Sequence, residues 1–453
     1  MSKTVKLRKG LDINLLGEAD KVTVDLEMPE MVALKPTDFH GLVPKMVVKP
    51  GDRVQVGSVV FFDKYNEQVK FVSPVSGTVE DIVRGEKRRI LEVLIKPDGS
   101  QEAITKDSVD PSSLSGDQVK QMMLENGLWP FMVQRPLDII ADPNVKPKAI
   151  FVSAFDSSPL APDYDFIVHG QDQYFQHGLN ALTKLTEGKV HLTLNGSAPA
   201  DVAFQNAKNV QINKIVGKHP AGNVGTQIHH IDPIDKGEFV FTLKPQDVLM
   251  LGKFFAEGKF DPSRMIAYTG SEAKNRKYYR TILGAKLTNL TQNNLESDNV
   301  RVISGNALTG TNVGKDGYLG FYDAQVTVLP EGDQYKFFLT KGWLGPGFDK
   351  YSSHRLFPTW LIKNKKFRLD TNLNGEERGF VVTGELEKVL PFDILPMQLI
   401  KAIMTNDIDG MEQLGIYEIA PEDFALCEYV CTSKVEIQEK IRQGLDIIKE
   451  ECM

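Results

Sequence analysis

The sequence predicts a multi-domain protein of the α/β class, with four consecutive parts. Its 453 residues give room for about three domains with hydrophobic cores. Apolar residues make up 41% of the chain and charged residues 25%, as in folded, water-soluble proteins. Strand and helix patterns alternate in the middle of the chain, short strands with tight turns flank them, and helical patterns end it. We therefore expect both sheets and helices, with several cores.

Charge and cysteine content exclude several classes of protein. The net charge is −7, and the basic residues form no long block, which argues against a nucleic-acid-binding protein. No apolar run reaches the ~18 to 20 residues of a membrane-spanning helix, and no hydrophobic signal segment follows the charged start. The three cysteines all lie in the last 27 residues, which is no disulfide framework. We expect a cytoplasmic protein with at most a peripheral membrane role.

Residues 1–105 carry the pattern of a sandwich of hairpins. Short apolar strands between residues 42 and 95 are separated by a Pro50-Gly51-Asp52 turn and a Pro74-Val75-Ser76-Gly77 turn. The pattern resembles the barrel-sandwich fold of biotinyl and lipoyl carrier domains. Carriers hold their prosthetic group on a lysine at a hairpin tip, but the residues around Lys64 lack the carrier motif. We expect Lys64 to be a solvated hairpin lysine.

Residues 106–257 predict a Rossmann-like domain with a parallel sheet. Alternation of strand and helix over this region implies crossovers between parallel strands. The predicted strands cover residues 148–154, 189–194 and 210–216, and the predicted helices cover 117–126, 172–185 and 200–207. The usual nucleotide-binding motifs are missing. No Gly-x-Gly-x-x-Gly follows a predicted strand, and residues 217–224 have the glycine spacing of a phosphate loop but carry Asn223 in place of its lysine. A Gly-x-Ser-x-Gly nucleophile motif is missing too.

The remaining two parts are a small β-grasp module of the SLBB-like type at residues 258–335 and a mostly helical domain at 336–453. Glycine-rich turns over 305–310 and 317–320 separate the short strands of the module. Helices are expected at 396–405 and 421–430, followed by one opened by a capping box from Ser433 to Glu436. That last helix places four apolar residues on one face, namely Ile437, Ile441, Leu445 and Ile448.

Histidines and cysteines offer weak candidates for a metal site. His219, His229, His230 and Asp232 are the densest potential ligand set, but a strand over 226–232 would point the two neighbouring imidazoles to opposite faces. Hydrogen bonding in a loop is the expected role, with no metal bound. Cys427 and Cys431 lie one helical turn apart, yet a four-iron cluster needs four thiolates. We expect both cysteines to be buried in a helix.

The order of the four parts resembles the NqrA family, the A subunits of the sodium-translocating NADH:quinone oxidoreductase, along the whole chain. The most specific mark is the stretch from Lys218 to Pro233, which reads KHPAGNVGTQIHHIDP, and further marks are residues 6–12, 84–89 and 422–429. The resemblance implies a peripheral subunit on the cytoplasmic face of the bacterial inner membrane. It also implies partner subunits B to F, which carry electrons from NADH to a quinone and export sodium.

The family is similar to the C subunit of Rnf complexes and to the flavin subunit of respiratory complex I, and the differences concern cofactors. Those relatives hold FMN on a Gly-Gly-Ala-Gly-Phe-Pro-Thr loop, whereas this chain has bulky residues over 127–136. It keeps one acid of their next motif, Asp156, and has Ser158 in place of the other. The resemblance thus implies that this chain binds no flavin and no cluster, and that FMN, FAD and iron centres belong to partner subunits.

A quinone site needs aromatic or apolar walls with one or two hydrogen-bond donors. Two stretches, residues 36–44 and 131–135, have this mixture, and we expect them to meet between the sandwich and the Rossmann-like domain near the surface. His40 and Arg135 are the expected donors, and no catalytic residue is assigned. The candidate quinone-binding residues are Phe39, His40, Phe131, Met132, Arg135 and Asp156.

Two other functions compete with quinone binding. One is a non-catalytic assembly or docking subunit of the same complex, with no ligand of its own. The other is a free-standing FMN enzyme, which the altered loop over 127–136 disfavours.

Overall fold

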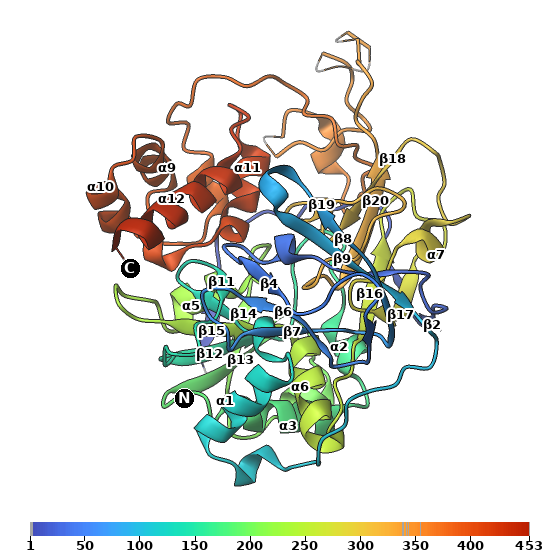
Figure 1. The fold of residues 1–453 in the computed structure, drawn as a ribbon. Coiled ribbons are helices and arrows are strands. Elements are labelled where there is room, and N and C mark those ends of the chain that lie inside the picture. The colour runs from blue at the N-terminus through green and yellow to red at the C-terminus, as the bar shows by residue number, and fades with distance from the viewer. Residues whose placement is uncertain (1–2, 338, 341, 343, 354, 453) are drawn as a thin grey trace.

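The computed structural model describes residues 3–337, 339–340, 342, 344–353 and 355–452. These residues form four β-sheets, with helices against the largest sheet and a group of helices at the C-terminus. Figure 1 shows the C-terminal helices gathered on one side of the molecule and the helices α3 (Asp172–Leu182) and α6 (Pro245–Glu257) on the opposite side. The predicted α/β architecture is confirmed.

Two facing sheets form the N-terminal sandwich. One has the strand order β3 (Val32–Leu34), β9 (Ile90–Pro97), β8 (Gly77–Arg84) and β5 (Arg53–Val54), and the other β4 (Pro44–Met46), β6 (Val59–Asp63) and β7 (Lys70–Val72). The rings of Phe61 and Phe71 stack in the core with centroids 4.6 Å apart. Lys64 is exposed in the turn after β6, with its ammonium group over the ring of Tyr65.

The largest sheet has the strand arrangement of a Rossmann-like domain. Its order is β1 (Thr4–Lys6), β14 (Gln211–Val216), β13 (Lys189–Asn195), β12 (Ala149–Ser153), β15 (Val240–Leu243), β10 (Val133–Arg135) and β11 (Ile139–Ile140). The first five are parallel to one another, and β10 is antiparallel to both of its neighbours, β15 and β11. The chain thus runs from β12 outward to β14, then returns to β15 beside β12. The three predicted strands are confirmed.

Helices connect these strands much as the sequence predicts. They are α1 (Gly116–Glu125), α2 (Tyr164–Val168), α3, α4 (Val202–Gln205), α5 (Val224–Ile231) and α6. The strand considered for 226–232 is wrong, because these residues lie in α5. Ile228 and Ile231, three positions apart, are both buried in one hydrophobic cluster with Ile215 and Phe151 of the sheet, a spacing that suits a helix and not a strand.

A mixed sheet forms the β-grasp module. Its order is β19 (Thr311–Asn312), β18 (Val300–Ser304), β20 (Gln325–Pro330), β16 (Ser263–Thr269), β17 (Lys277–Ile282) and β2 (Asp20–Asp25), and the short helix α7 (Thr288–Thr291) packs against it. The first strands of the chain therefore leave the sandwich. β1 pairs with β14 of the Rossmann-like sheet, and β2 pairs with β17 of the module.

The C-terminal part is helical from residue 386 onward. Its helices are α8 (Leu386–Val389), α9 (Pro396–Met404), α10 (Ile408–Gln413), α11 (Ala425–Val430) and α12 (Ile437–Cys452). The four apolar residues predicted on one face of the last helix are all buried, which confirms that helix. No helix among the described residues is long and apolar enough to cross a membrane.

Two details of this part differ from the expectation. The capping box is not formed, because α12 begins at Ile437 and the Ser433 hydroxyl donates to the carbonyl oxygen of Gly379 at 2.9 Å. The Glu428 carboxylate instead accepts from the backbone N–H of Gln438 at 2.8 Å. Cys427 lies in α11, but Cys431 follows its last residue, so the two do not share a helix face. Both thiols are buried, and burial raises the pKa of Cys427 above its ordinary value.

Candidate binding cleft

A cleft of about 350 Å³ opens at the carboxyl ends of β12 and β15. These two strands are neighbours in the sheet although β13 and β14 lie between them in the sequence, so the cleft lies at the switch point where the strand order reverses. Open α/β sheets bind their ligands at this point because the connecting loops separate there. Ser153 at the end of β12, Lys244 after β15 and the start of α5 at Val224 all line the cleft.

Three other parts of the chain close the cleft. The sandwich contributes Phe39 and His40, which follow the 3-10 helix η1 (Pro36–Asp38). The β-grasp module contributes Gln325 at the start of β20, and the C-terminal part contributes Glu422 and Arg442. All four parts of the molecule therefore meet at one site.

Aromatic rings form one wall of the cleft. The rings of Phe131 and Phe321 stack with centroids 4.4 Å apart, and the ring of Phe39 meets Phe321 edge-on at 4.7 Å. The Tyr322 hydroxyl donates to the carbonyl oxygen of Pro130 at 2.6 Å. Burial raises the pKa of Tyr322 and of Tyr164 well above the ordinary value of a phenol, so both keep their proton at neutral pH. This wall offers apolar ring atoms and a phenolic O–H from Tyr164.

A buried arginine lines the cleft where the cleft meets the C-terminal part of the chain. The Arg135 guanidinium is only 3% exposed and lies between three carboxylates. Its nitrogens are 3.2 Å from Asp138, 2.6 Å from Glu422 and 3.1 Å from Asp423. Burial alone lowers the pKa of Arg135, but the three carboxylates raise it above its ordinary value. The expectation that Arg135 lies near the surface is therefore wrong, because Glu422 and Asp423 cover it.

The same cluster holds more acid than base. Arg442 adds a second guanidinium, 3.1 Å from Asp138, so two arginines face three carboxylates. Burial raises the pKa of Asp423 to about 7, and Arg135 only partly offsets this shift. Burial raises the pKa of Glu422 in the same way. The excess negative charge is relieved when one carboxyl group keeps a proton.

Polar atoms without a partner among the described residues lie at the inner end of the cleft. The Asp247 side chain is buried, and its Oδ1 accepts from Arg264 at 2.7 Å, whereas its Oδ2 has no hydrogen-bond partner among the described atoms. Ser158 Oγ and Gln325 Oε1 are likewise buried without a hydrogen-bond partner among the described atoms, and both residues line the cleft. Buried polar atoms are normally paired, so these three atoms mark the inner end as a place for polar groups of a ligand or for water.

Two histidines line the cleft in different settings. His40 is 39% exposed, and its Nε2 lies 2.6 Å from the Asp446 carboxylate of α12, which orients the ring. His219 is buried, its Nδ1 lies 3.0 Å from the Ser157 hydroxyl, and its backbone N–H donates to Asp12 at 2.9 Å. Burial lowers the pKa of His219, which favours the neutral ring.

The structure brings five of the six candidate residues into the lining of one cleft. Phe39, His40, Phe131, Arg135 and Asp156 line it, and Met132 is fully buried outside the lining. Sequence reasoning missed Tyr164, Asp247 and Gln325. Asp247 follows closely after β15, so the carboxyl-end rule for parallel strands could have indicated it. Gln325 reaches the cleft from a distant sheet, and no local pattern signals that position.

The other histidines of the motif face the C-terminal part. His229 Nδ1 lies 2.7 Å from Glu418, and its Nε2 accepts from the backbone N–H of Asp393 at 3.1 Å. His230 Nε2 donates to the carbonyl oxygen of Pro391 at 2.9 Å. Over the part of the chain that the structure describes, no three potential ligands converge on a metal position. Hydrogen bonding is thus what the described contacts of these histidines show, on a helix and not in a loop.

Comparison with family models matches three parts of the chain. Residues 5–98 match the NqrA N-terminal barrel-sandwich hybrid domain, and residues 114–260 match the NqrA second alpha/beta domain. Residues 265–315 match the model described as the NQRA C-terminal domain, of the SLBB type.

Curated relatives match over almost the full length. The A subunit of the Na(+)-translocating NADH-quinone reductase of Neisseria meningitidis serogroup A is 38% identical over 451 residues, covering 99% of this chain and 100% of the relative. The protein of the same name from Pasteurella multocida is 39% identical over 452 residues, with the same coverage. Among solved structures, an NAD+-reducing [NiFe]-hydrogenase in the air-oxidized state aligns with a TM-score of 0.35 and 10% identity, over 68% of this chain and 55% of that one.

Proposed function

Because the chain belongs to the NqrA family, the A subunits of Na(+)-translocating NADH-quinone reductases, we propose that it is a peripheral subunit of such a complex and that its cleft binds the quinone. Its partners are then subunits B to F, on the cytoplasmic face of the inner membrane. The observation that supports quinone binding best is the cleft at the switch point of the sheet, with an aromatic wall and donors beside it.

The lining suits a quinone ring with a partly apolar tail. Phe39 and Phe131 line the cleft and give the ring an apolar wall. As the ring is reduced, negative charge grows on its carbonyl oxygens, and a nearby N–H or O–H donor stabilises that charge. His40 is the better donor of the two expected, because Asp446 pairs with its Nε2 and, when the ring carries both protons, leaves the Nδ1–H to donate, whereas three carboxylates engage the Arg135 guanidinium.

The segment over 127–136 does not fit a flavin phosphate. Its 3-10 helix η4 (Trp129–Phe131) is buried, and the Trp129 indole N–H donates to the carbonyl oxygen of Ala141 at 2.7 Å. Phe131 is packed against Phe321. A phosphate loop needs small residues and free backbone N–H groups, and bulky packed side chains leave neither. This packing supports the proposal that the chain binds no flavin and that electrons reach the quinone from cofactors of partner subunits.

The test is the quinone dependence of NADH oxidation by the assembled complex. Replacing His40 by Ala removes a donor, and we expect the apparent quinone affinity to fall by roughly tenfold to a hundredfold. His169→Ala is a matched control, because His169 also pairs with an aspartate, Asp201 at 2.8 Å, but is 78% exposed and does not line the cleft. If His40→Ala leaves the apparent quinone affinity unchanged in an intact complex, the quinone does not bind in this cleft.

The second candidate is the assembly subunit without a ligand. It is favoured by the burial of Arg135 under Glu422 and Asp423, since such an interdomain ion cluster also suits a rigid scaffold. Quinone titration separates the two functions. A scaffold shows no saturable quinone binding, either as the isolated chain or in a complex whose other quinone sites are blocked.

A further inference from the structure

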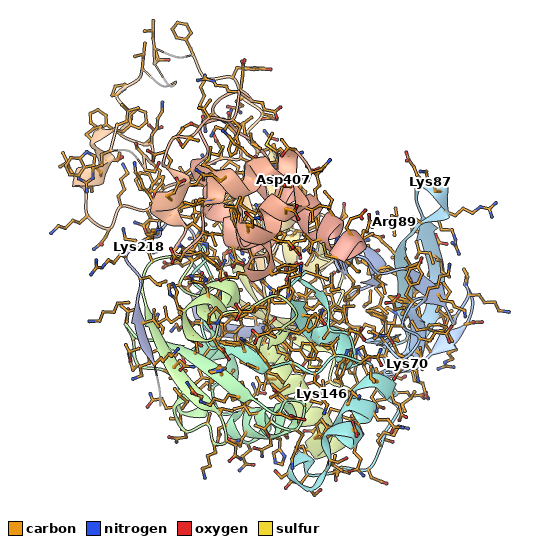
Figure 2. The ribbon with its side chains drawn as sticks, turned by 90° about the vertical axis from the view of Figure 1, so that its left-hand side faces the viewer. Lys70, Lys87, Arg89, Lys146, Lys218 and Asp407 are labelled. Atoms are coloured by element: carbon orange, nitrogen blue, oxygen red, sulfur yellow. The ribbon has the colours of Figure 1, made fainter. Side chains whose placement is uncertain are left out.

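Within the segment 344–368, the described residues 344–353 and 355–368 are irregular and expose large apolar side chains. The only regular element within its described residues is the short 3-10 helix η5 (Pro358–Leu361). Leu356 is 71% exposed and Trp360 51%, and Leu344, Phe348, Leu361 and Ile362 are also more than half exposed. Single exposed apolar residues are ordinary, but a dense group of them indicates an interaction surface. Figure 2 shows this part of the chain projecting at the upper left, beyond the C-terminal helices.

The segment is basic, although the chain as a whole is acidic. Between residues 344 and 368 there are six Lys and Arg residues and a single acid, Asp349, whereas the net charge of the chain is −7. Several of these cations are held by groups that carry no charge. The Lys350 ammonium lies 5.1 Å from the centre of the Phe357 ring, and the Arg355 guanidinium lies 5.1 Å from that of Trp360. Lys365 donates to the carbonyl oxygen of Phe348. Their positive charge is therefore not cancelled by these contacts.

A pocket of about 410 Å³ lies within the segment. Four cations line it, namely Lys350, Lys365, Lys366 and Arg368, together with the rings of Phe348 and Phe367. Two of the cations are paired with acids from elsewhere, Lys366 with Glu18 at 2.6 Å and Arg368 with Glu272 at 2.8 Å. Lys350 and Lys365 form no ion pair with an acid among the described residues, so their positive charges are available to a ligand in the pocket. The site thus combines positive charge with aromatic faces, which suits an anionic group attached to an apolar chain.

We propose that residues 344–368 dock on a bilayer of anionic phospholipid, with the pocket receiving a phosphodiester headgroup. Lys and Arg are attracted to the negative surface of such a bilayer, and Trp, Phe and Leu side chains enter the region between headgroups and acyl chains. A protein partner fits the composition less well, because the cores of protein interfaces are depleted in lysine, and here lysines alternate with the exposed aromatic residues.

The experiment is co-sedimentation of the full chain with lipid vesicles. One vesicle preparation is phosphatidylcholine alone, and the other contains roughly one third phosphatidylglycerol. We expect the chain to bind the anionic vesicles at least about tenfold more strongly, since each cation near such a surface contributes a factor of about five. Binding should weaken as salt screens the surface charge. Equal binding to both preparations, or no binding to either, would overturn the proposal.

Matched variants assign the effect to this segment. The double variant Lys350→Glu with Lys365→Glu should lose at least about tenfold in binding to the anionic vesicles. Lys70→Glu with Lys146→Glu makes the same change of charge at two lysines that Figure 2 shows in the lower half of the molecule, away from the segment, and it should bind like the unchanged chain. Trp360→Ser should weaken binding without changing its salt dependence. Equal loss in both double variants would indicate a general charge effect and contradict the site.

Two further outcomes distinguish other ligands. Inorganic phosphate that releases the chain from anionic vesicles more effectively than sodium chloride of equal ionic strength would assign the pocket to free phosphate. Failure of the Lys350 and Lys365 double variant to assemble into the complex, with unchanged vesicle binding, would assign the segment to a protein partner. Either result would overturn lipid docking.

Discussion

Arg135 is the side chain on which the junction between the Rossmann-like and C-terminal parts depends. Its buried guanidinium contacts Asp138, Glu422 and Asp423. Replacing Arg135 by Ala leaves buried carboxylates without their cation, and we expect the free energy of unfolding to fall by about 3 to 5 kcal/mol. Urea unfolding followed by circular dichroism measures the change. Lys146→Ala is the control, because its ion pair with Glu187 is fully on the surface and its loss should leave the unfolding curve unchanged.

The carboxyl group of Asp423 gives the same junction a dependence on pH. Burial raises its pKa from 3.8 to about 7, so the folded chain holds a proton that the unfolded chain releases. The stabilisation from this group is therefore complete below pH 3.8 and is lost as the pH rises through about 7. Between about pH 5 and about pH 8, Asp423→Asn should lose less stability than the unchanged chain, because an amide does not titrate. Identical pH profiles of the unfolding free energy would contradict this assignment.

Helices α3 and α6 pack backbone against backbone, and two glycines permit this contact. A Cβ atom at Gly252 would overlap the carbonyl oxygen of Tyr174, and one at Gly178 would overlap that of Val248. Gly252→Ala should therefore force the helices apart and lower the free energy of unfolding by about 1 to 3 kcal/mol, although alanine favours a helix. Gly379→Ala is the control, since a Cβ atom there meets nothing within 4 Å. Thermal unfolding of both variants provides the comparison.

Helices and strands with a regular apolar period could be predicted from the sequence, and the exceptions have local causes. Ile437, Ile441, Leu445 and Ile448 predicted α12 correctly because each buries on one face. Its start could not be predicted, because Glu428 from the preceding helix replaces the expected cap. Helix α5 resembles a strand in its sequence because β-branched residues and histidines also suit strands, although the spacing of Ile228 and Ile231 already favours a helix.

The candidate site shows where sequence reasoning ends. Phe39 and Phe131 could be predicted as wall residues because each lies in a short aromatic stretch beside a polar residue. The burial of Arg135 could not be predicted from the sequence. The residues that cover it, Glu422 and Asp423, follow 287 and 288 positions later in the chain. Contacts at that separation depend on how whole domains pack, and no local pattern carries that information.

The molecule as a whole offers, over its described residues, no evident site for a flavin or a dinucleotide, and this leads to a prediction for the purified protein. It has no dinucleotide fingerprint, and its segment over 127–136 is filled by packed side chains. We expect the isolated chain to be colourless and unable to oxidise NADH, because it provides no hydride acceptor. Absorption spectroscopy and an NADH oxidation assay with an artificial electron acceptor measure both properties. A flavin or cluster band in stoichiometric amount, or turnover comparable with that of the complex, would contradict the prediction.

The pairing of β1 with β14 has a consequence for the order of events during synthesis. The backbone N–H of Lys3 donates to Asn213 Oδ1 across 210 positions, and Arg280 reaches Asp25 across 255. At roughly 5 to 20 residues per second, a ribosome needs on the order of ten to forty seconds to make the partner of β1 after β1 itself has emerged. The Rossmann-like sheet and the β-grasp sheet each take one of their two edge strands, β1 and β2, from the start of the chain. The first 25 residues of the nascent chain therefore lack their strand partners until β14 and β17 have been made, which makes this stretch late to fold.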